Sequence, residues 1–183
     1  LKPSNNLDFS NKDCPNANIV FAPKKDEADI DYYSEIPSYF FKDSIIKSVS
    51  FTADITTIGS SAFEETTVTD AINLAGATKL ETISSRAFYD ARINSITFPA
   101  SLKTIQGSAF ELCRVSSTLN FASSNLLTEI SDEKVFKGAV ITTFSWPPNL
   151  VSLYTPSSPV KSEYEKCTFY QCQISTLNLQ TGT

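Results

Sequence analysis

Apolar and polar positions recur along the chain in a phrase that returns roughly every 23 residues. The clearest copy is Leu80–Pro99, LETISSRAFYDARINSITFP, in which the constant positions are apolar and the variable positions are polar. Each copy has a phenylalanine near its centre, and this column consists of Phe41, Phe63, Phe88, Phe110, Phe136 and Phe169. Six copies in register predict stacked repeats, because one copy alone cannot bury its apolar residues.

Further apolar columns accompany the phenylalanines. A β-branched residue follows each of them by five positions: Ile46, Val68, Ile93, Val115, Ile141 and Ile174. Each copy then closes with two apolar residues separated by a polar one: Val49/Phe51, Ile72/Leu74, Ile96/Phe98, Leu119/Phe121, Phe144/Trp146 and Leu177/Leu179. This alternation predicts a short strand with every second residue inside. Stacking then predicts a parallel ladder of strands about 4.8 Å apart.

The repeats divide the chain into two regions. Residues 1–32 hold a degenerate first copy with an insertion, and residues 33–183 hold about six copies. In the first copy Ile19 and Phe21 match the closing apolar pair, which places Asn11 at the phenylalanine position.

Two insertions interrupt the regular spacing of the repeats, at residues 22–31 and 154–166. Insertions in repeat proteins project as loops. Each is either a solvated connection or a binding loop held on a rigid scaffold. If the second loop binds a partner, Tyr154 and Tyr164 are its candidate anchors.

The polar residues beside and between the paired apolar residues should point outward and form one flat, uncharged sheet face. The candidate binding residues on this face are Ser50, Asn73, Ser95, Thr97, Thr118, Asn120, Thr143, Ser145 and Asn178. Such residues either solvate an exposed sheet or bind a protein or a glycan, since solenoids use extended surfaces for binding.

The composition is that of a globular protein, with 41% hydrophobic and 19% charged residues among 183. The net charge is −5 and the charges are interspersed, which disfavours nucleic acid as a partner. The chain has no histidine, which removes Ser–His and Cys–His catalysis and the commonest transition-metal ligand. Neighbouring carboxylates such as Glu64 and Glu65 occupy variable positions, so we expect them to be solvated. We therefore predict no catalytic residue, no metal site and no cofactor.

The four cysteines match no zinc-binding spacing. Cys113 and Cys172 share one inward column two copies apart, about 10 Å and beyond the Cα–Cα reach of a disulfide. We expect them to be buried free thiols, with Cys14 in the same column of the first copy. A disulfide between Cys167 and Cys172 stays an alternative if the turn that contains them is irregular.

Two features bear on the membrane. The chain has no apolar run long enough for a transmembrane helix and no apolar signal region near residue 1. It contains no methionine, so we expect a processed form or a piece of a longer protein. Any membrane anchor would then lie in parts outside this chain.

The repeated phrase resembles the BspA-type, or treponemal-type, leucine-rich repeat, which runs L-x-x-I-x-x-x-A-F-x-x-C-x-x-L-x-x-I-x-[IL]-P. Leu80–Pro99 matches most clearly, Leu102–Phe121 follows closely, and the resemblance extends over about residues 33–179. Here the stretch after the phenylalanine is one residue shorter, and the column cysteine remains at Cys113 and Cys172. The resemblance implies a right-handed leucine-rich-repeat solenoid, β-rich, with a parallel strand ladder and short helical or irregular turns.

The same resemblance implies a cell-surface or secreted protein of a bacterium or parasitic protist that adheres to host or matrix proteins. We therefore expect a non-catalytic protein-interaction module whose partner is a host or extracellular-matrix protein. Two alternatives stay open: a carbohydrate-binding module that uses the Ser/Thr/Asn face, and a structural spacer in a longer surface protein. An enzyme is disfavoured because the sequence shows no convergent polar cluster.

Overall fold

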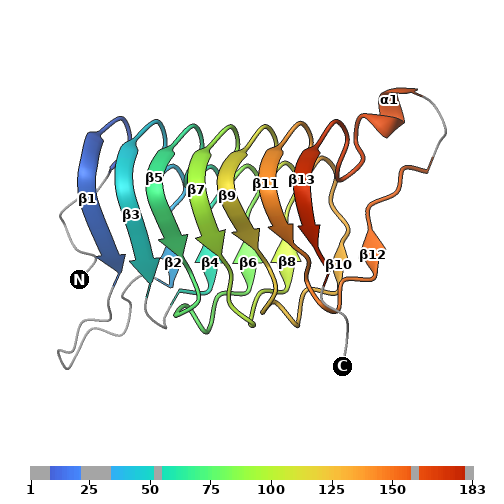
Figure 1. Cartoon of the computed structure of the whole chain (residues 1–183), viewed down its shortest axis with the longest axis horizontal. Coiled ribbons are helices and arrows are strands. Elements are labelled where there is room, and N and C mark those ends of the chain that lie inside the picture. Colours follow the sequence, from blue (N-terminus) through green and yellow to red (C-terminus); the bar gives the residue numbers. More distant parts are fainter. Residues whose placement is uncertain (1–8, 22–33, 52–54, 158–160, 180–183) are drawn as a thin grey trace.

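The long strands of successive repeats stack into a parallel β-solenoid with almost no helix (Figure 1). The computed structural model describes residues 9–21, 34–51, 55–157 and 161–179. One seven-stranded sheet follows the chain order, and neighbouring strands are parallel. Its strands are β1 (Asp13–Phe21), β3 (Ile45–Phe51), β5 (Thr67–Asn73), β7 (Arg92–Thr97), β9 (Arg114–Asn120), β11 (Val140–Ser145) and β13 (Gln173–Asn178). The predicted parallel-strand solenoid is confirmed.

The second wall of the solenoid consists of two-residue strands. They are β2 (Glu35–Ile36), β4 (Thr57–Ile58), β6 (Thr82–Ile83), β8 (Thr104–Ile105), β10 (Glu129–Ile130) and β12 (Ser152–Leu153). The first four form one sheet and the last two another. The break falls at the copy in which Phe136 lies six residues after the isoleucine of its short strand, Ile130. In the preceding copy Phe110 lies five residues after the corresponding Ile105. Among the described residues, the one α-helix is α1 (Lys161–Tyr164), in the second insertion.

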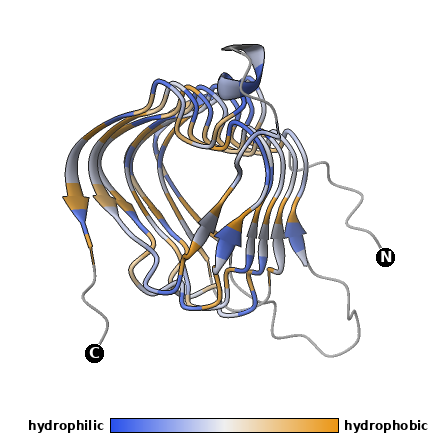
Figure 2. Cartoon of the chain, turned by 90° about the vertical axis from the view of Figure 1, so that its right-hand side faces the viewer, coloured by the Kyte–Doolittle hydropathy of each residue, from blue (hydrophilic) through white to orange (hydrophobic). Residues whose placement is uncertain are grey.

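A continuous apolar core fills the space between the two walls. Figure 2 shows apolar positions recurring along the stacked rungs. Ring centroids are 5.0 Å apart between Phe63 and Phe88 and 4.9 Å between Phe88 and Phe110, and both pairs are stacked. Phe98 and Phe121 form a second stack at 4.3 Å. Each such aromatic contact adds about 0.5–1.5 kcal/mol to the free energy of burial. The predicted phenylalanine column is therefore the centre of the core.

On β3, β5, β7, β9 and β11, two buried positions three or four residues apart face this core. In β7, Ile93 and Ile96 are buried, while Arg92 is exposed and Asn94 and Thr97 are half-buried. The prediction of buried closing pairs is wrong for the last copy, where Leu177 and its partner Leu179 are 48% and 66% exposed. β13 is the last strand of the sheet, so no described strand packs over it.

The first copy has a different register from the predicted one. Cys14 pairs with Ile46 across β1 and β3, and the N–H of Phe9 donates to the carbonyl oxygen of Phe40 at 3.1 Å. The ring of Phe9 packs on that of Phe41, with centroids 5.5 Å apart. Phe9, not Asn11, therefore occupies the phenylalanine position, and Cys14 does not share the column of the other cysteines. β1 contains extra residues between Cys14 and Asn18, where its pairing with β3 is irregular. A register counted back from the end of β1 is therefore shifted.

The turns that connect the two walls contain left-handed residues in nearly every copy. One series with positive φ is Asn11, Asp43, Glu65, Asp90, Leu112, Gly138 and Gln171. A residue other than glycine pays about 1–2 kcal/mol for this conformation. Hydrogen bonds between neighbouring turns offset this cost, as when the N–H of Glu65 donates to the carbonyl oxygen of Tyr89 at 2.8 Å.

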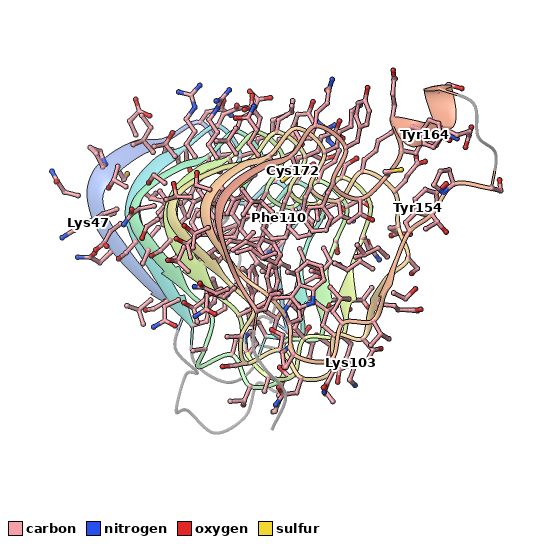
Figure 3. The ribbon with its side chains drawn as sticks, turned by 45° about the vertical axis from the view of Figure 1, so that its right-hand side comes forward. Lys47, Lys103, Phe110, Tyr154, Tyr164 and Cys172 are labelled. Atoms are coloured by element: carbon pink, nitrogen blue, oxygen red, sulfur yellow. The ribbon has the colours of Figure 1, made fainter. Side chains whose placement is uncertain are left out.

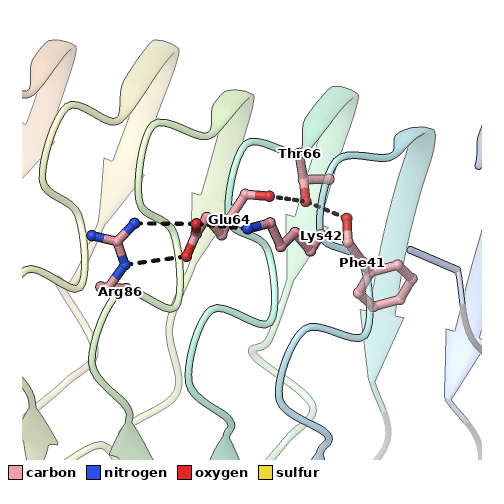
Figure 4. Close-up of polar contacts among 5 residues, drawn as sticks. All are labelled: Phe41, Lys42, Glu64, Thr66 and Arg86. Carbon is pink, nitrogen blue, oxygen red and sulfur yellow. Dashed lines mark hydrogen bonds and ion pairs between the residues drawn. The ribbon is translucent and has the colours of Figure 1, made fainter. Parts of the chain in front are cut away.

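A buried carboxylate, Glu64, links three neighbouring turns (Figure 4). Its Oε1 accepts hydrogen bonds from Lys42 Nζ at 3.0 Å and from Arg86 Nη2 at 3.1 Å. Its Oε2 accepts a third from Arg86 Nε at 3.2 Å. Beside it, Thr66 Oγ1 donates to the carbonyl oxygen of Phe41 at 2.6 Å. Side chains thus connect the turns in addition to the backbone ladder.

The charge of Glu64 is held by these partners. Burial by itself raises the pKa of Glu64, but hydrogen bonds from Arg86, Ser61 and Lys42 outweigh it and lower that pKa to about 2. The prediction that Glu64 is solvated is wrong, because the turns on either side each supply a cation. Its neighbour Glu65 is exposed, as predicted.

The cysteines are all free thiols. Cys113 is fully buried, and burial raises the pKa of its thiol far above the ordinary value. Cys172 is half-buried, and burial raises its pKa to about 11. The predicted free thiol at Cys113 is confirmed, and Cys167 forms no disulfide with Cys172.

Replacing Phe88 by alanine should lower the free energy of unfolding by about 3–5 kcal/mol, because it leaves a cavity in the middle of the ring stack. Tyr89 lies outside the core, and its ring centroid is 3.7 Å from Arg86 Cζ. Tyr89→Ala should cost about 1 kcal/mol or less. Denaturant melts of both variants measure these losses, and equal losses would contradict the inward assignment of the phenylalanine column.

Glu64→Gln should lower the free energy of unfolding at pH 7 by up to about 3 kcal/mol. The folded pKa of about 2 lies below the ordinary 4.5, so the carboxylate stabilises the fold above pH 4.5 and this contribution is lost as pH falls toward 2. Denaturant melts at pH 7 and pH 3 should therefore show a smaller difference from wild type at pH 3. As a control, Glu81→Gln removes the exposed partner of Lys103 and should cost under about 1 kcal/mol. A pH-independent difference for Glu64→Gln would rule out this electrostatic role.

Candidate interaction site

The outward side of the seven-stranded sheet carries the predicted binding residues in two rows. The members of the first row lie opposite one another on neighbouring strands: Ser50, Asn73, Thr97, Asn120, Ser145 and Asn178. The second row holds Ser95, Thr118 and Thr143, on β7, β9 and β11. We call these nine residues the outer face. The structure brings them together on one surface, and their role in binding stays a prediction.

Exposure varies along the outer face. Asn73 and Asn178 are exposed, whereas the half-buried members are Ser50, Ser95, Thr97, Thr118, Asn120 and Thr143. Ser145 is only 9% exposed, so the expectation that it offers its hydroxyl to solvent is wrong. Its short side chain lies between the longer amides of Asn120 and Asn178 on the neighbouring strands.

Two asparagines of the outer face have a structural task at the strand ends. Asn73 Oδ1 accepts a hydrogen bond from the N–H of Ala75 at 3.1 Å, and Asn120 Oδ1 accepts one from the N–H of Ala122 at 3.0 Å. These are Asx turns, which lead the chain out of the strand. The amide oxygen of each residue is therefore occupied, and its Nδ2 is the group left for a partner.

Two polar residues on the same side were missed by the sequence analysis. Ser116 Oγ donates to Asn94 Oδ1 at 3.2 Å, which links β9 to β7. Both residues lie where the strand register shifts, between the two inward positions. The available signal was the unequal spacing of those positions, three residues from Ile93 to Ile96 but four in β9.

A mostly apolar notch of about 250 Å³ opens at the end of β7, beside the outer face. The turn at 98–102 is two residues shorter than the turns at 74–80 and 121–127 on either side. The longer turns form the walls and the shorter one forms the floor, so the lining residues are Ala75, Thr78, Phe98, Pro99, Ala100, Ser101 and Ser123. The notch is large enough for one side chain of a partner.

The second insertion lies away from the outer face. Figure 3 shows Tyr154 and Tyr164 on the side of the molecule opposite Lys47, which belongs to β3. Tyr164 is 48% exposed at the end of α1. Tyr154 is half-buried, and its N–H donates to the carbonyl oxygen of Ile130 at 2.6 Å. The outer face and this loop are therefore separate candidate sites, and the first insertion, 22–31, lies outside the described residues.

In the described part of the chain, no three His, Cys, Asp or Glu side chains are grouped so that they could hold a metal ion. Among the same residues, no helix has the length and apolar character that crossing a membrane requires. The outer face, the notch and the Tyr154–Tyr164 loop are thus the candidates that the geometry offers.

Comparison with known proteins agrees with the repeat architecture. A family model described as BspA type leucine rich repeat region matches residues 34–157 in six copies. No curated protein and no solved structure matches the chain. Because the family match covers more than half of the 183 residues, the chain belongs to the BspA-type leucine-rich repeat family.

Proposed function

We propose that this chain is the non-catalytic interaction module of a surface or secreted protein and that it binds a host or extracellular-matrix protein through the outer face. The family supports the interaction role, because leucine-rich-repeat solenoids present extended binding surfaces. The surface location and the adhesive partner are inferences from the resemblance of the repeats.

The observation that carries the proposal is the regularity of the outer face. Small, uncharged polar side chains repeat from strand to strand in two rows, and successive members of a row are about 4.8 Å apart. The stacked core behind them fixes their positions. A protein partner gains from such a surface because its hydrogen-bonding groups meet donors and acceptors that need no rearrangement.

The experiment compares two kinds of partner, proteins and glycans. The chain is immobilised and tested by surface plasmon resonance against a panel of purified extracellular-matrix proteins, and the labelled chain is applied to a glycan array. Saturable binding to a protein supports the proposal. Binding to glycans alone would favour a carbohydrate-binding module, and no saturable partner in either assay would favour a structural spacer.

Thr97→Arg combined with Thr118→Arg should weaken binding to the protein found in this panel by about tenfold or more, because two bulky charges then stand in the middle of the outer face. Both threonines are half-buried on adjacent strands and take no part in the Asx turns. Thr104→Arg, at an exposed position of the opposite wall, is the matched control and should leave affinity unchanged.

A loop variant separates the two candidate sites. Tyr164→Ala should leave affinity unchanged, since the residue lies on α1, away from the outer face. Loss of binding in Tyr164→Ala, with normal binding in the double arginine variant, would place the site on the second insertion.

A further inference from the structure

Several oppositely charged side chains on neighbouring rungs of the turns and the short-strand wall form ion pairs. Glu64 lies between Lys42 and Arg86, as described above. Lys103 Nζ lies 2.7 Å from an oxygen of Glu81, and Lys137 Nζ lies 3.4 Å from an oxygen of Glu111. Such pairing stabilises a ladder, because side chains on adjacent rungs lie within contact distance.

One position of the long-strand sheet instead places two like charges side by side. Arg92 of β7 and Arg114 of β9 are directly paired in the parallel ladder, and both are exposed. Within the described residues, neither guanidinium forms an ion pair or a hydrogen bond. The flanking members of their row are Thr67 and Val140, which carry no charge. Like charges placed directly opposite each other destabilise a sheet, so this pair costs the free protein stability.

The strand residues beside the pair are polar, whereas the nearest acidic residues along the chain, Asp90 and Glu111, lie in the turns that precede β7 and β9. Both are half-buried, and Glu111 forms an ion pair with Lys137. Asn94 and Ser116 lie two positions further along the same strands and join the arginines to the outer face. Among the long strands β3, β5, β7, β9, β11 and β13, the sole acidic residue is Asp70, on β5. The two arginines therefore form a local positive patch on a chain whose net charge is −5.

We propose that Arg92 and Arg114 bind carboxylate side chains of a partner protein, so that the outer face recognises a segment containing Asp or Glu. This inference rests on the proposed function and names the chemistry of its partner. A guanidinium presents a planar fork of donors that matches a carboxylate with two parallel hydrogen bonds. Paired residues on neighbouring strands lie about 4.8 Å apart, so one carboxylate can contact both guanidinium groups, and two carboxylates neutralise both charges. Binding also removes the repulsion between them.

The extent of the patch favours an acidic protein segment over a sulfated polysaccharide. A polyanion gains affinity from many cations in a row, and each additional contact adds to its salt dependence. Here two cations stand together, and the chain as a whole is negative. A short segment with one or two carboxylates matches the charge that this surface offers.

The experiment uses the fact that Arg86, Arg92 and Arg114 are the three arginines of the chain. Their Nε–H groups give three signals in a proton–nitrogen NMR spectrum. The probe is the peptide Ser-Glu-Ser-Glu-Ser with blocked ends, and its neutral counterpart has Gln in place of Glu. The signals of Arg92 and Arg114 should shift with the Glu peptide and not with the Gln peptide. The Arg86 signal should stay fixed, because Glu64 already occupies that guanidinium.

Two variants test the assignment at equal net charge. Arg92→Gln combined with Arg114→Gln should weaken binding of the Glu peptide by about tenfold. Lys47→Gln combined with Lys103→Gln removes the same charge from β3 and from the opposite wall, and it should leave the affinity unchanged. Equal losses in the two double variants, or equal shifts with both peptides, would overturn the proposal. Binding of a heparin oligosaccharide in place of the Glu peptide would overturn it in favour of a sulfated glycan.

The outcome can be told apart from failure of the proposed function. If the Thr97→Arg, Thr118→Arg variant loses the matrix protein while the arginine-to-glutamine variant keeps it, the outer face binds a partner but the arginine pair does not select it. If the Glu peptide shifts the NMR signals of Arg92 and Arg114 while the threonine variant keeps its partner, the arginine pair binds carboxylates but the outer face is not the adhesive surface.

Discussion

Every feature of this structure depends on the requirement that each rung cover the apolar side of the rung before it. Phe88 illustrates the constraint, because its two ring faces are covered by Phe63 and Phe110 at centroid distances of 5.0 and 4.9 Å. Parallel strands repeat at about 4.8 Å, which is close to the distance at which aromatic rings stack. One translation along the solenoid therefore satisfies the backbone hydrogen bonds and the ring contacts together. An isolated repeat would leave both ring faces in water.

The same translation explains what could be predicted from the sequence. The spacing of the apolar columns predicted the inward residues of the inner copies. A residue that recurs once per repeat lies next to the equivalent residue of the neighbouring repeat. The spacing failed at Phe9, where extra residues in β1 shift the count between Cys14 and Ile19. It also missed the ion pairs of Glu64, although Lys42 and Arg86 lie one rung length, 22 residues, before and after it. These ion-pair partners are distant in sequence and meet only between neighbouring repeats of the stack.

The outer face shows a different limit. Column position alone predicted its members, but the use of each side chain depends on local backbone geometry. Asn73 and Asn120 use their amide oxygens to close the turns that follow them, and Ser145 is only 9% exposed. The arginine pair of β7 and β9 arises from the same 22-residue spacing that gives Glu64 its cations. A repeat length shared by adjacent copies thus places charges in contact whether they attract or repel.

The direction of the ladder hydrogen bonds has a mechanical consequence. These bonds run along the solenoid axis, from β1 at one end to β13 at the other (Figure 1). A tension applied between the two ends would act on the rungs in series, so every contact between rungs would carry the same force and the weakest one would separate first. A pull along the strands would instead shear all the bonds between two rungs at once. The fold should therefore separate more easily under a force along the solenoid axis than under a force across it.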